Sequence, residues 1–270
     1  MKAPARWSRL RRLLLPALLA PLFACVAPLA NGAAPAPLTA GQVPQPALAD
    51  GGYPYQLFIP RAAAADREQA ARWPLLIFLH GSGERGADIA RVKAHGPPKI
   101  ADRDPDFPFI LVSPLLPAEE DWDIGKLDAI VDHVTARLPV DRDRIYLTGL
   151  SRGGHATWRW GALEPGRFAA LAPVAGRGDP TTGCALVDVP VWALHGDRDD
   201  VVVPEGSFAM ARAIRACGGL RSRLTIYPDL GHNAWDPAYD SPALYLWLLQ
   251  QRRAAPLGRA GDHRVDGSGR

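Results

Sequence analysis

The sequence predicts an α/β protein in which a mostly parallel central sheet carries helices on both of its faces. Short apolar runs of β-forming residues alternate along the chain with stretches of helical periodicity. Most of these runs are continuously apolar, as expected of strands that are buried on both faces. The roughly 200 residues between the two terminal segments contain no internal linker and no repeat, which indicates one domain.

The expected strands and helices follow one another between residues 53 and 253. The strands are 53–59, 75–79, 109–113, 144–148, 169–174, 191–194 and 224–227, and the first of them is expected to pair antiparallel. The helices are 126–137, 152–163, 205–216 and 242–253. Sites in open sheets of this kind lie at the carboxyl ends of the strands, so the residues after each strand are the candidates for chemistry.

The two ends of the chain differ in composition from the body between them. Residues 1–34 combine a basic start with an apolar stretch and small residues, which predicts a cleaved secretory signal and a secreted or periplasmic protein. A membrane anchor and a lipoprotein modified at Cys25 are the alternatives for this segment. Residues 35–52 are expected to form a flexible leader, 53–253 the folded α/β domain and 254–270 a disordered tail.

The net charge of +3 has its origin at the two ends of the chain. Residues 1–34 contain five basic residues and no acidic residue, and residues 252–270 carry a surplus of three positive charges. The body, 35–251, is therefore negative, with a net charge of −5. Binding to nucleic acid needs a basic face on the folded domain, so no nucleic-acid partner is expected.

A G-x-S-x-G pattern at positions 149–153 stands directly between the expected strand 144–148 and the expected helix 152–163. Gly149 and Gly153 leave room for a tight turn, and Ser151 between them is pushed out over the edge of the sheet. The start of the helix behind Ser151 adds free N–H groups and positive potential. Ser151 is therefore the candidate nucleophile.

A serine hydroxyl needs a base, and an acid to orient that base. In this strand–turn–helix topology, the acid and then the histidine are expected to follow the serine in the chain. The strand 191–194 is followed by three acidic residues. Asp199 is the expected acid, and Asp200 and Asp197 are the alternatives. The strand 224–227 is followed by His232, the expected general base.

The tetrahedral intermediate of such a reaction needs N–H donors aimed at its oxyanion. One is expected from the backbone of Arg152, the residue after the nucleophile. The other is expected from the backbone of Ser82, or alternatively of Gly83, in the glycine-rich loop after the strand 75–79. His80 and His195 each precede a glycine at a strand end and are interpreted as packing or turn-fixing residues.

Together these residues resemble the α/β-hydrolase fold, and within it the dienelactone-hydrolase-like and polyhydroxybutyrate-depolymerase-like bacterial serine carboxylesterases. The segments that carry the resemblance are HGSGERGAD (80–88), HGPPK (95–99), RIYLTGLSRGGHATW (144–158), RFAALAPVAGRGDP (167–180), VPVWALHGDRDDVVVP (189–204) and YPDLGHNAWDPAY (227–239). The resemblance implies Ser151, Asp199 and His232 as nucleophile, acid and base, and Ser82 and Arg152 as the oxyanion hole. Dienelactone hydrolases have a cysteine where this chain has Ser151, so dienelactone is not the expected substrate.

Several further side chains are candidates for roles around the site. Substrate contacts are expected from Glu84, His95, Trp122 and Trp235, whereas Trp158, Trp160 and Trp247 are expected in the core. Cys184 and Cys217 form an even pair that is either a disulfide or two separate thiols. The sequence has no metal-ligand spacing and no nucleotide-binding loop, so neither a metal nor a cofactor is expected.

The resulting hypothesis is an exported serine hydrolase that cleaves carboxylic esters, of small molecules or of oligomers, through an acyl-enzyme. No long insertion follows the strand 169–174, so an open cleft without a large lid is expected, which argues against a lipase. A serine peptidase of the prolyl-oligopeptidase type and a non-catalytic binding protein on the same fold are the alternatives. The mature protein is expected to be a monomer without a stable membrane span.

Overall fold

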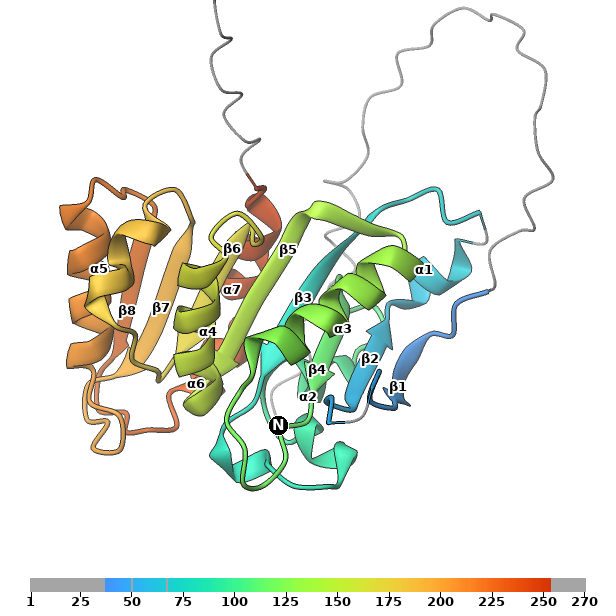
Figure 1. Ribbon diagram of the computed structural model, residues 1–270, viewed down its shortest axis with the longest axis horizontal. Coiled ribbons are helices and arrows are strands. Elements are labelled where there is room, and N and C mark those ends of the chain that lie inside the picture. Colours follow the sequence, from blue (N-terminus) through green and yellow to red (C-terminus); the bar gives the residue numbers. More distant parts are fainter. Residues whose placement is uncertain (1–36, 50, 67, 254–270) are drawn as a thin grey trace, which may run out of the picture.

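The computed structural model describes residues 37–49, 51–66 and 68–253 (Figure 1). The expected signal 1–34, with Cys25 inside it, and the expected tail 254–270 lie outside the described residues. Within the described part of the chain, no helix is both long enough and apolar enough to cross a lipid bilayer.

The centre of the structure is an eight-stranded sheet with the strand order β1-β2-β4-β3-β5-β6-β7-β8. The strands are β1 (Gly41–Gln45), β2 (Tyr55–Ile59), β3 (Trp73–Leu79), β4 (Ile110–Pro114), β5 (Val140–Leu150), β6 (Ala170–Val174), β7 (Val191–Gly196) and β8 (Ser222–Tyr227). β2 pairs antiparallel with both β1 and β4, and the remaining neighbours are parallel. The predicted mostly parallel sheet with an antiparallel start is therefore confirmed.

Strand β1 lies inside the segment that was expected to be a flexible leader, so that prediction is wrong for Gly41–Gln45. β1 pairs residue by residue with β2, from Gly41 opposite Ile59 to Gln45 opposite Tyr55. The Gln42 amide also donates to the Pro98 carbonyl at 2.8 Å. β1 is a polar edge strand held by backbone pairing, and Pro44 is tolerated at such an edge. The folded domain thus begins before residue 53.

Helices cover both faces of the sheet (Figure 1). They are α1 (Arg61–Ala65), α2 (Gly96–Ala101), α3 (Ile124–Arg137), α4 (Arg152–Leu163), α5 (Glu205–Ala216), α6 (Trp235–Asp240) and α7 (Pro242–Gln250), with 3-10 segments η2 (Ser82–Glu84), η3 (Ile89–Lys93) and η4 (Pro180–Leu186). The four predicted helices correspond to α3, α4, α5 and α7. The other three have five or six residues, which is too short for a helical period to show in the sequence.

The core consists of two apolar layers separated by the sheet. Alternate residues of β3 serve the two layers: Leu75, Ile77 and Leu79 belong to the layer under α3, α4 and α5. Leu76 and Phe78 belong to the layer under α2, α6 and α7. This division explains why the strand is continuously apolar. The three tryptophans expected in the core are buried there, namely Trp158, Trp160 and Trp247.

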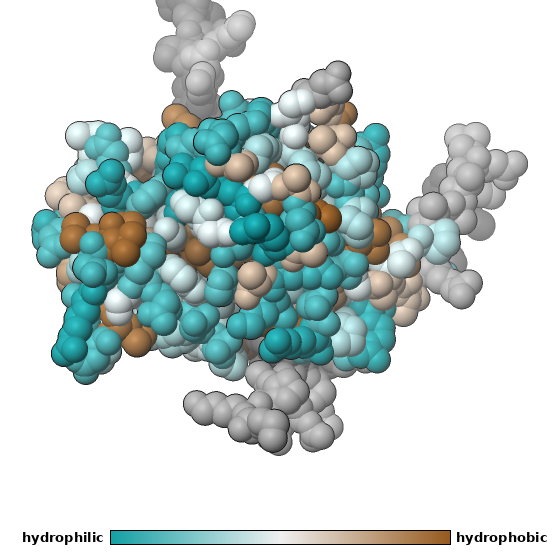
Figure 2. Space-filling view, turned by 90° about the horizontal axis from the view of Figure 1, so that it is seen from below, coloured by the Kyte–Doolittle hydropathy of each residue, from teal (hydrophilic) through white to brown (hydrophobic). Residues whose placement is uncertain are grey.

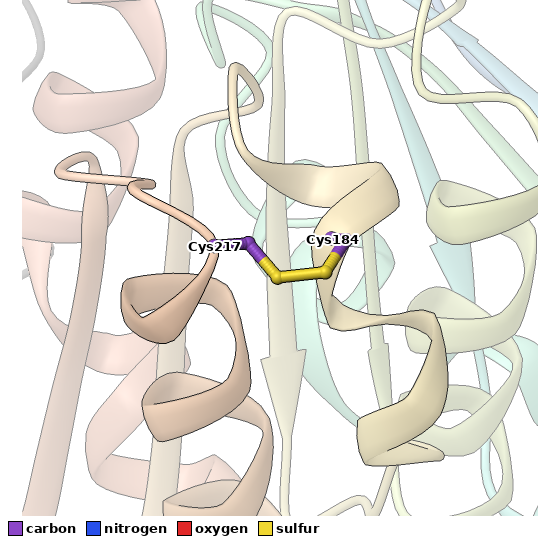
Figure 3. Close-up of a disulfide and its surroundings, with 2 residues drawn as sticks. All are labelled: Cys184 and Cys217. Atoms are coloured by element: carbon purple, nitrogen blue, oxygen red, sulfur yellow. A yellow bond between two sulfur atoms is a disulfide. The ribbon is translucent and has the colours of Figure 1, made fainter.

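A disulfide joins Cys184 in η4 to Cys217 at the end of α5 (Figure 3). Their Cα atoms are 5.2 Å apart, within the range that a disulfide requires. Of the two predicted alternatives, the structure therefore has the disulfide. It ties the segment after β6 to the end of α5.

Candidate active site

The loops that follow β3, β5, β7 and β8 meet at the carboxyl edge of the parallel strands, toward the lower side of Figure 1. Figure 2 shows the molecule from that side, where the described surface is mostly hydrophilic and apolar patches are separate from one another. The predicted nucleophile, acid and base each stand in one of these loops.

Ser151 occupies a strained turn between β5 and α4. Its φ of 53° and ψ of −115° are unusual for a residue with a side chain, and they aim the hydroxyl away from the sheet. The turn is held by the Ser151 N–H, which donates to the Val174 carbonyl at 2.9 Å. A Cβ at Gly149 would lie 2.5 Å from the Gly153 carbonyl oxygen, and a Cβ at Gly153 would overlap the Leu79 carbonyl. The two glycines of the G-x-S-x-G pattern are therefore steric requirements of the turn.

Ser151, His232 and Asp199 form a continuous chain of hydrogen bonds. His232 Nε2 lies 2.8 Å from Ser151 Oγ, and His232 Nδ1 lies 2.8 Å from Asp199 Oδ2. A carboxylate can only accept at Nδ1, so Nδ1 carries the hydrogen and Nε2 is free to accept the serine proton. This is the arrangement in which a histidine acts as a general base toward serine.

Among the three acidic residues of its loop, Asp199 is the one whose carboxylate lies against His232. The Asp199 carboxylate is buried, whereas Asp197 and Asp200 are exposed. Its Oδ1 accepts from the N–H groups of Val201 and Val202, at 3.1 and 2.8 Å. These bonds leave Oδ2 facing His232 and compensate for the burial of a charged group.

His195 is fully buried and contacts the same carboxylate from the other side. Its Nε2 lies 3.1 Å from Asp199 Oδ2 and 2.7 Å from the Val202 carbonyl oxygen, while its Nδ1 lies 2.8 Å from Ser207 Oγ. Both neighbours of Nε2 are acceptors, so Nε2 carries a hydrogen. The prediction of a turn-fixing histidine is correct, but it missed that the turn being fixed holds the candidate acid.

His80 has a comparable structural role at the end of β3. Its Nδ1 lies 2.7 Å from the Gly81 carbonyl oxygen, and its Nε2 accepts from the Leu116 N–H at 3.0 Å. Burial lowers the pKa of His80 to about 4, so the ring is neutral at neutral pH. His80 therefore joins the loop after β3 to the segment after β4, as expected of a packing residue.

The two loops expected to supply the oxyanion donors are adjacent. The Arg152 guanidinium Nε donates to Ser82 Oγ at 2.9 Å, and both residues line the same cavity as Ser151. Arg152 is the first residue of α4, where backbone N–H groups have no partner within the helix. The Gly81 N–H donates to Glu84 Oε2 at 2.9 Å.

Two of the four residues that were expected to contact substrate are buried in the structure. Trp122 is 1% exposed and packs edge to face on Tyr53 and His80, so it belongs to the core. Glu84 is also buried, and its carboxylate holds the Gly81 N–H and shapes its own loop. The prediction of substrate contact is wrong for both residues because their loops fold inward.

The other two expected contacts, His95 and Trp235, lie next to the candidate base. The rings of Trp235 and His232 meet edge to face with centroids 5.1 Å apart, and the His95 ring also contacts Trp235, with centroids 5.8 Å apart. His95 Nε2 lies 3.6 Å from Glu84 Oε1 and Nδ1 lies 3.8 Å from Asp236 Oδ1. Both side chains are half-buried, so they remain candidates for substrate contact.

The cavity at Ser151 is also lined by residues that the sequence interpretation missed, among them Asp121, His155 and Arg159. Asp121 accepts from the Arg152 guanidinium at 3.0 Å. Burial alone would raise the pKa of Asp121, but the hydrogen bonds from Arg152 and the Trp122 N–H outweigh it and lower the pKa. Asp121 stands far from the serine motif in the sequence, so nothing in the sequence links it to the cavity. His155 and Arg159 stand four and eight positions after Ser151 on the following helix, and this spacing could have placed them on the side of the helix that faces the cavity.

No cluster of histidine, cysteine or acidic side chains with the arrangement of a metal site occurs among the residues that the structure describes. The side chains named above lie together at the carboxyl edge of the parallel strands. The arrangement offers a nucleophilic hydroxyl, a base with its orienting carboxylate, and N–H groups beside them.

Comparisons with known proteins agree with this fold. No family model matches the chain. NocK of Nocardia uniformis, which is assigned by name to the esterases, is 35% identical over 83 residues, or 30% of this chain and 24% of NocK. A Salmonella typhimurium protein assigned by name to the carboxymethylenebutenolidases is 29% identical over 38% of this chain and 43% of its own length. The bifunctional acetylxylan esterase/xylanase XynS20E of Neocallimastix patriciarum is 30% identical over 48% of this chain and 20% of that protein. The chain thus spans less than half the length of each of these relatives.

Solved structures show the same fold. A thermostable esterase is 29% identical, with a TM-score of 0.64 over 74% of this chain and 60% of that one. An acylaminoacyl peptidase of Pyrococcus horikoshii is 13% identical, with a TM-score of 0.58 over 81% of this chain and 42% of that one, which shows likeness of fold alone. The sheet and these likenesses show that the chain has the α/β-hydrolase fold.

Proposed function

We propose that this protein is a serine hydrolase that cleaves carboxylic esters through an acyl-enzyme intermediate. The observation that carries the proposal is the hydrogen-bonded chain from Ser151 Oγ through His232 to the buried Asp199. A serine hydroxyl is a weak nucleophile unless a base is positioned to take its proton. Here both hydrogen bonds of the base are 2.8 Å long.

In the proposed acylation, Ser151 Oγ attacks the ester carbonyl carbon while its proton passes to His232 Nε2. The carbonyl π electrons move onto the oxygen, and the tetrahedral intermediate then expels the alcohol, which leaves with the proton from His232. Asp199 holds the ring in place and stabilises the imidazolium that forms during the step. Water, deprotonated by His232, then attacks the acyl carbon. The bond to Ser151 Oγ breaks, the carboxylic acid is released, and the proton on His232 returns to Ser151 Oγ.

The charge on the intermediate's oxygen requires N–H donors on the side opposite His232. We assign these donors to the backbone of Arg152 and of Ser82. The support for this assignment is that both residues line the cavity at Ser151 and that their side chains are hydrogen-bonded to each other. That bond keeps the two loops in a fixed relation, so the donors need no rearrangement during the reaction.

Ester hydrolysis is favoured over peptide hydrolysis by the sequence relatives, which are assigned by name to esterases and to a lactone hydrolase. The likeness of fold to an acylaminoacyl peptidase keeps a peptidase as the second candidate. The two chemistries share the fold and the triad, and they differ in the leaving group that His232 has to protonate.

We also propose that the protein is exported. The composition of residues 1–34 supports this, as does the disulfide between Cys184 and Cys217, because disulfides persist mainly in oxidising compartments. Sequencing the N-terminus of the protein from fractionated cells tests this. An unprocessed chain in the cytoplasm would contradict it.

The test of the function is a panel of p-nitrophenyl esters beside aminoacyl p-nitroanilides, assayed with the natural protein and with Ser151→Ala. We expect hydrolysis of the esters, little hydrolysis of the anilides, and a loss of several powers of ten in kcat/KM in the variant. Preferred hydrolysis of the anilides would establish the peptidase instead. Ester hydrolysis that survives Ser151→Ala would overturn the proposed mechanism.

A further inference from the structure

Two cavities lie end to end along helix α4. One, of about 290 Å³, contains Ser151, and the other, of about 490 Å³, contains Arg177 and Asp179. His155 and Arg159 line both cavities. We call their combined space the α4 groove, which begins at the candidate nucleophile and runs along the helix.

One face of α4 forms a wall of this groove. Its wall residues Arg152, His155, Arg159 and Leu163 are spaced by three or four positions, which places them on the same side of the helix. Twelve residues of α-helix extend about 18 Å. The groove can therefore hold a substrate chain of several bonds beyond the carbonyl that Ser151 attacks.

The groove contains three arginines whose bonding differs. Arg152 is engaged by Asp121 and Ser82. Arg159 donates to the Trp122 carbonyl, a neutral acceptor. The exposed guanidinium of Arg177 has neither a hydrogen bond nor an ion pair with another residue in the described ranges. Arg159 and Arg177 are thus cations without a carboxylate at ion-pair distance among the described residues.

The described carboxylates of the groove form no ion pair with Arg159 or Arg177, although the charge of Arg159 contributes to lowering the pKa of Asp121. Asp121 is bound to Arg152, and Asp179 caps η4 by accepting from the Thr181 N–H at 2.9 Å and hydroxyl at 2.7 Å. His155 Nδ1 accepts from the Arg177 N–H at 2.8 Å. Burial lowers the pKa of His155, and the charge of Arg177 adds to this, so the ring is neutral. Three permanent cations therefore face two carboxylates, in a body whose net charge is negative.

The groove also has apolar walls, beside Ser82 and Thr182. They are formed by Ala156, Ala162, Leu163, Val201 and Val202. A ligand that satisfies both features has an apolar chain with an anionic group at its far end. His232, which has to reach the leaving oxygen, is not among the groove residues, so the acyl part of an ester is the part that enters.

We propose that the α4 groove binds an acyl chain that ends in a free carboxylate, with Arg177 and Arg159 on the carboxylate. The substrate class is then the monoesters of dicarboxylic acids, including ends of polyester chains. This inference rests on the proposed ester hydrolysis at Ser151. Arginine suits the role because its guanidinium can donate two parallel hydrogen bonds to one carboxylate.

The test compares p-nitrophenyl hemiesters of succinic, adipic and suberic acid with the same compounds capped as methyl esters. We expect kcat/KM for at least one hemiester to exceed that of its capped partner by about tenfold, mostly through KM, and the ratio to fall as salt is added. Arg177→Gln should reduce the ratio of kcat/KM between each hemiester and its capped partner to near one. Arg103→Gln is the matched control, because Arg103 is an exposed arginine outside the groove, after α2 on the other face of the sheet. An absent preference, or one that Arg177→Gln leaves intact, would overturn the proposal.

A binding measurement separates this inference from the proposed function. Calorimetry of the Ser151→Ala protein with suberic acid monomethyl ester and with the dimethyl ester measures the affinity of each ester without turnover. We expect tighter binding of the monomethyl ester, and loss of the difference when Arg177→Gln is added. Equal binding of the two esters would overturn the groove proposal even if ester hydrolysis is found. A preference that depends on Arg177 in a protein without esterase activity would leave the groove standing and overturn the proposed function.

Discussion

His195 Nε2 lies 3.1 Å from Asp199 Oδ2, the same oxygen that faces the candidate base His232 at 2.8 Å. The carboxylate is thus held between two imidazole rings and two backbone N–H groups. A fully buried charge needs such partners, since each missing hydrogen bond to a charged group costs about 1.5–3 kcal/mol. His195 is therefore a positioning residue that keeps the Asp199 carboxylate oriented toward His232.

Replacing His195 tests this relationship. We expect His195→Ala to lower kcat for ester hydrolysis by about tenfold to a hundredfold, with a smaller change in KM, because the Asp199 carboxylate loses a donor. His195→Gln, which can still offer an N–H, should recover part of kcat. The measurement is the pH profile of kcat for the three proteins. An unchanged profile in His195→Ala would limit His195 to packing.

The pH dependence of stability provides a second prediction, from His80. Its pKa is about 4 in the folded protein and near 6.5 in the unfolded chain, so the unfolded state binds a proton first as the pH falls. The stability contributed by the neutral ring is present above about pH 6.5 and is lost progressively as the pH falls toward 4. Between pH 7 and pH 5 we expect a loss of about 2 kcal/mol from this residue.

Denaturant unfolding at pH 7 and pH 5 checks the His80 prediction, with His80→Asn for comparison. The variant is expected to be less stable at pH 7, because bonds to Gly81 and Leu116 are disturbed. Its stability should nevertheless fall less between the two pH values than that of the natural protein. Equal losses in both proteins would assign the pH dependence to other groups.

The turn at the nucleophile predicts a large effect of one methyl group. Gly153→Ala places a Cβ on the Leu79 carbonyl, which belongs to the rigid backbone of β3, so we expect a loss of about 3 kcal/mol or more in the free energy of unfolding. The matched control is Gly166→Ala, where a Cβ has no atom within 4 Å and the backbone is not left-handed. Thermal unfolding of both variants gives the comparison. A fully stable Gly153→Ala protein would contradict the described turn.

The disulfide predicts a dependence of stability on redox conditions. Cys184 and Cys217 are separated by 33 positions, and closing a loop of that size stabilises a protein by about 3–4 kcal/mol in the chain-entropy description. Reduction should therefore lower Tm by several degrees. The double variant Cys184→Ser/Cys217→Ser should have a Tm close to that of the reduced natural protein, and this Tm should not change when reductant is added. A natural protein whose Tm is indifferent to reductant would show that the bond contributes little.

The layered fold could be predicted from the sequence because a strand that is buried on both faces of the sheet has a continuously apolar sequence. The run Leu75–Leu79 is apolar throughout because alternate residues serve the two core layers. β1 could not be predicted, since a polar edge strand depends on backbone pairing with β2 and not on its side chains. The short helices α1, α2 and α6 are likewise determined by tertiary contacts.

The site was predictable where chemistry follows strand ends and was not predictable where loops pack. The loops after β5, β7 and β8 bring Ser151, Asp199 and His232 together as the order of the strands requires. A loop tryptophan such as Trp122 gives no sign in the sequence of whether it lines a pocket or enters the core. The approach of Arg177 to the α4 helix also depends on a loop after β6, and so it appears only in three dimensions.

The most direct test of the central claim is the mass of the protein after reaction with a fluorophosphonate, a reagent that phosphonylates activated serines. Our account predicts one adduct per chain, located on Ser151 by peptide mapping. The adduct should be lost in Ser151→Ala and formed much more slowly in His232→Ala, because the hydroxyl then lacks its base. A protein that remains unlabelled, or that is labelled at another residue, would contradict the proposed serine nucleophile.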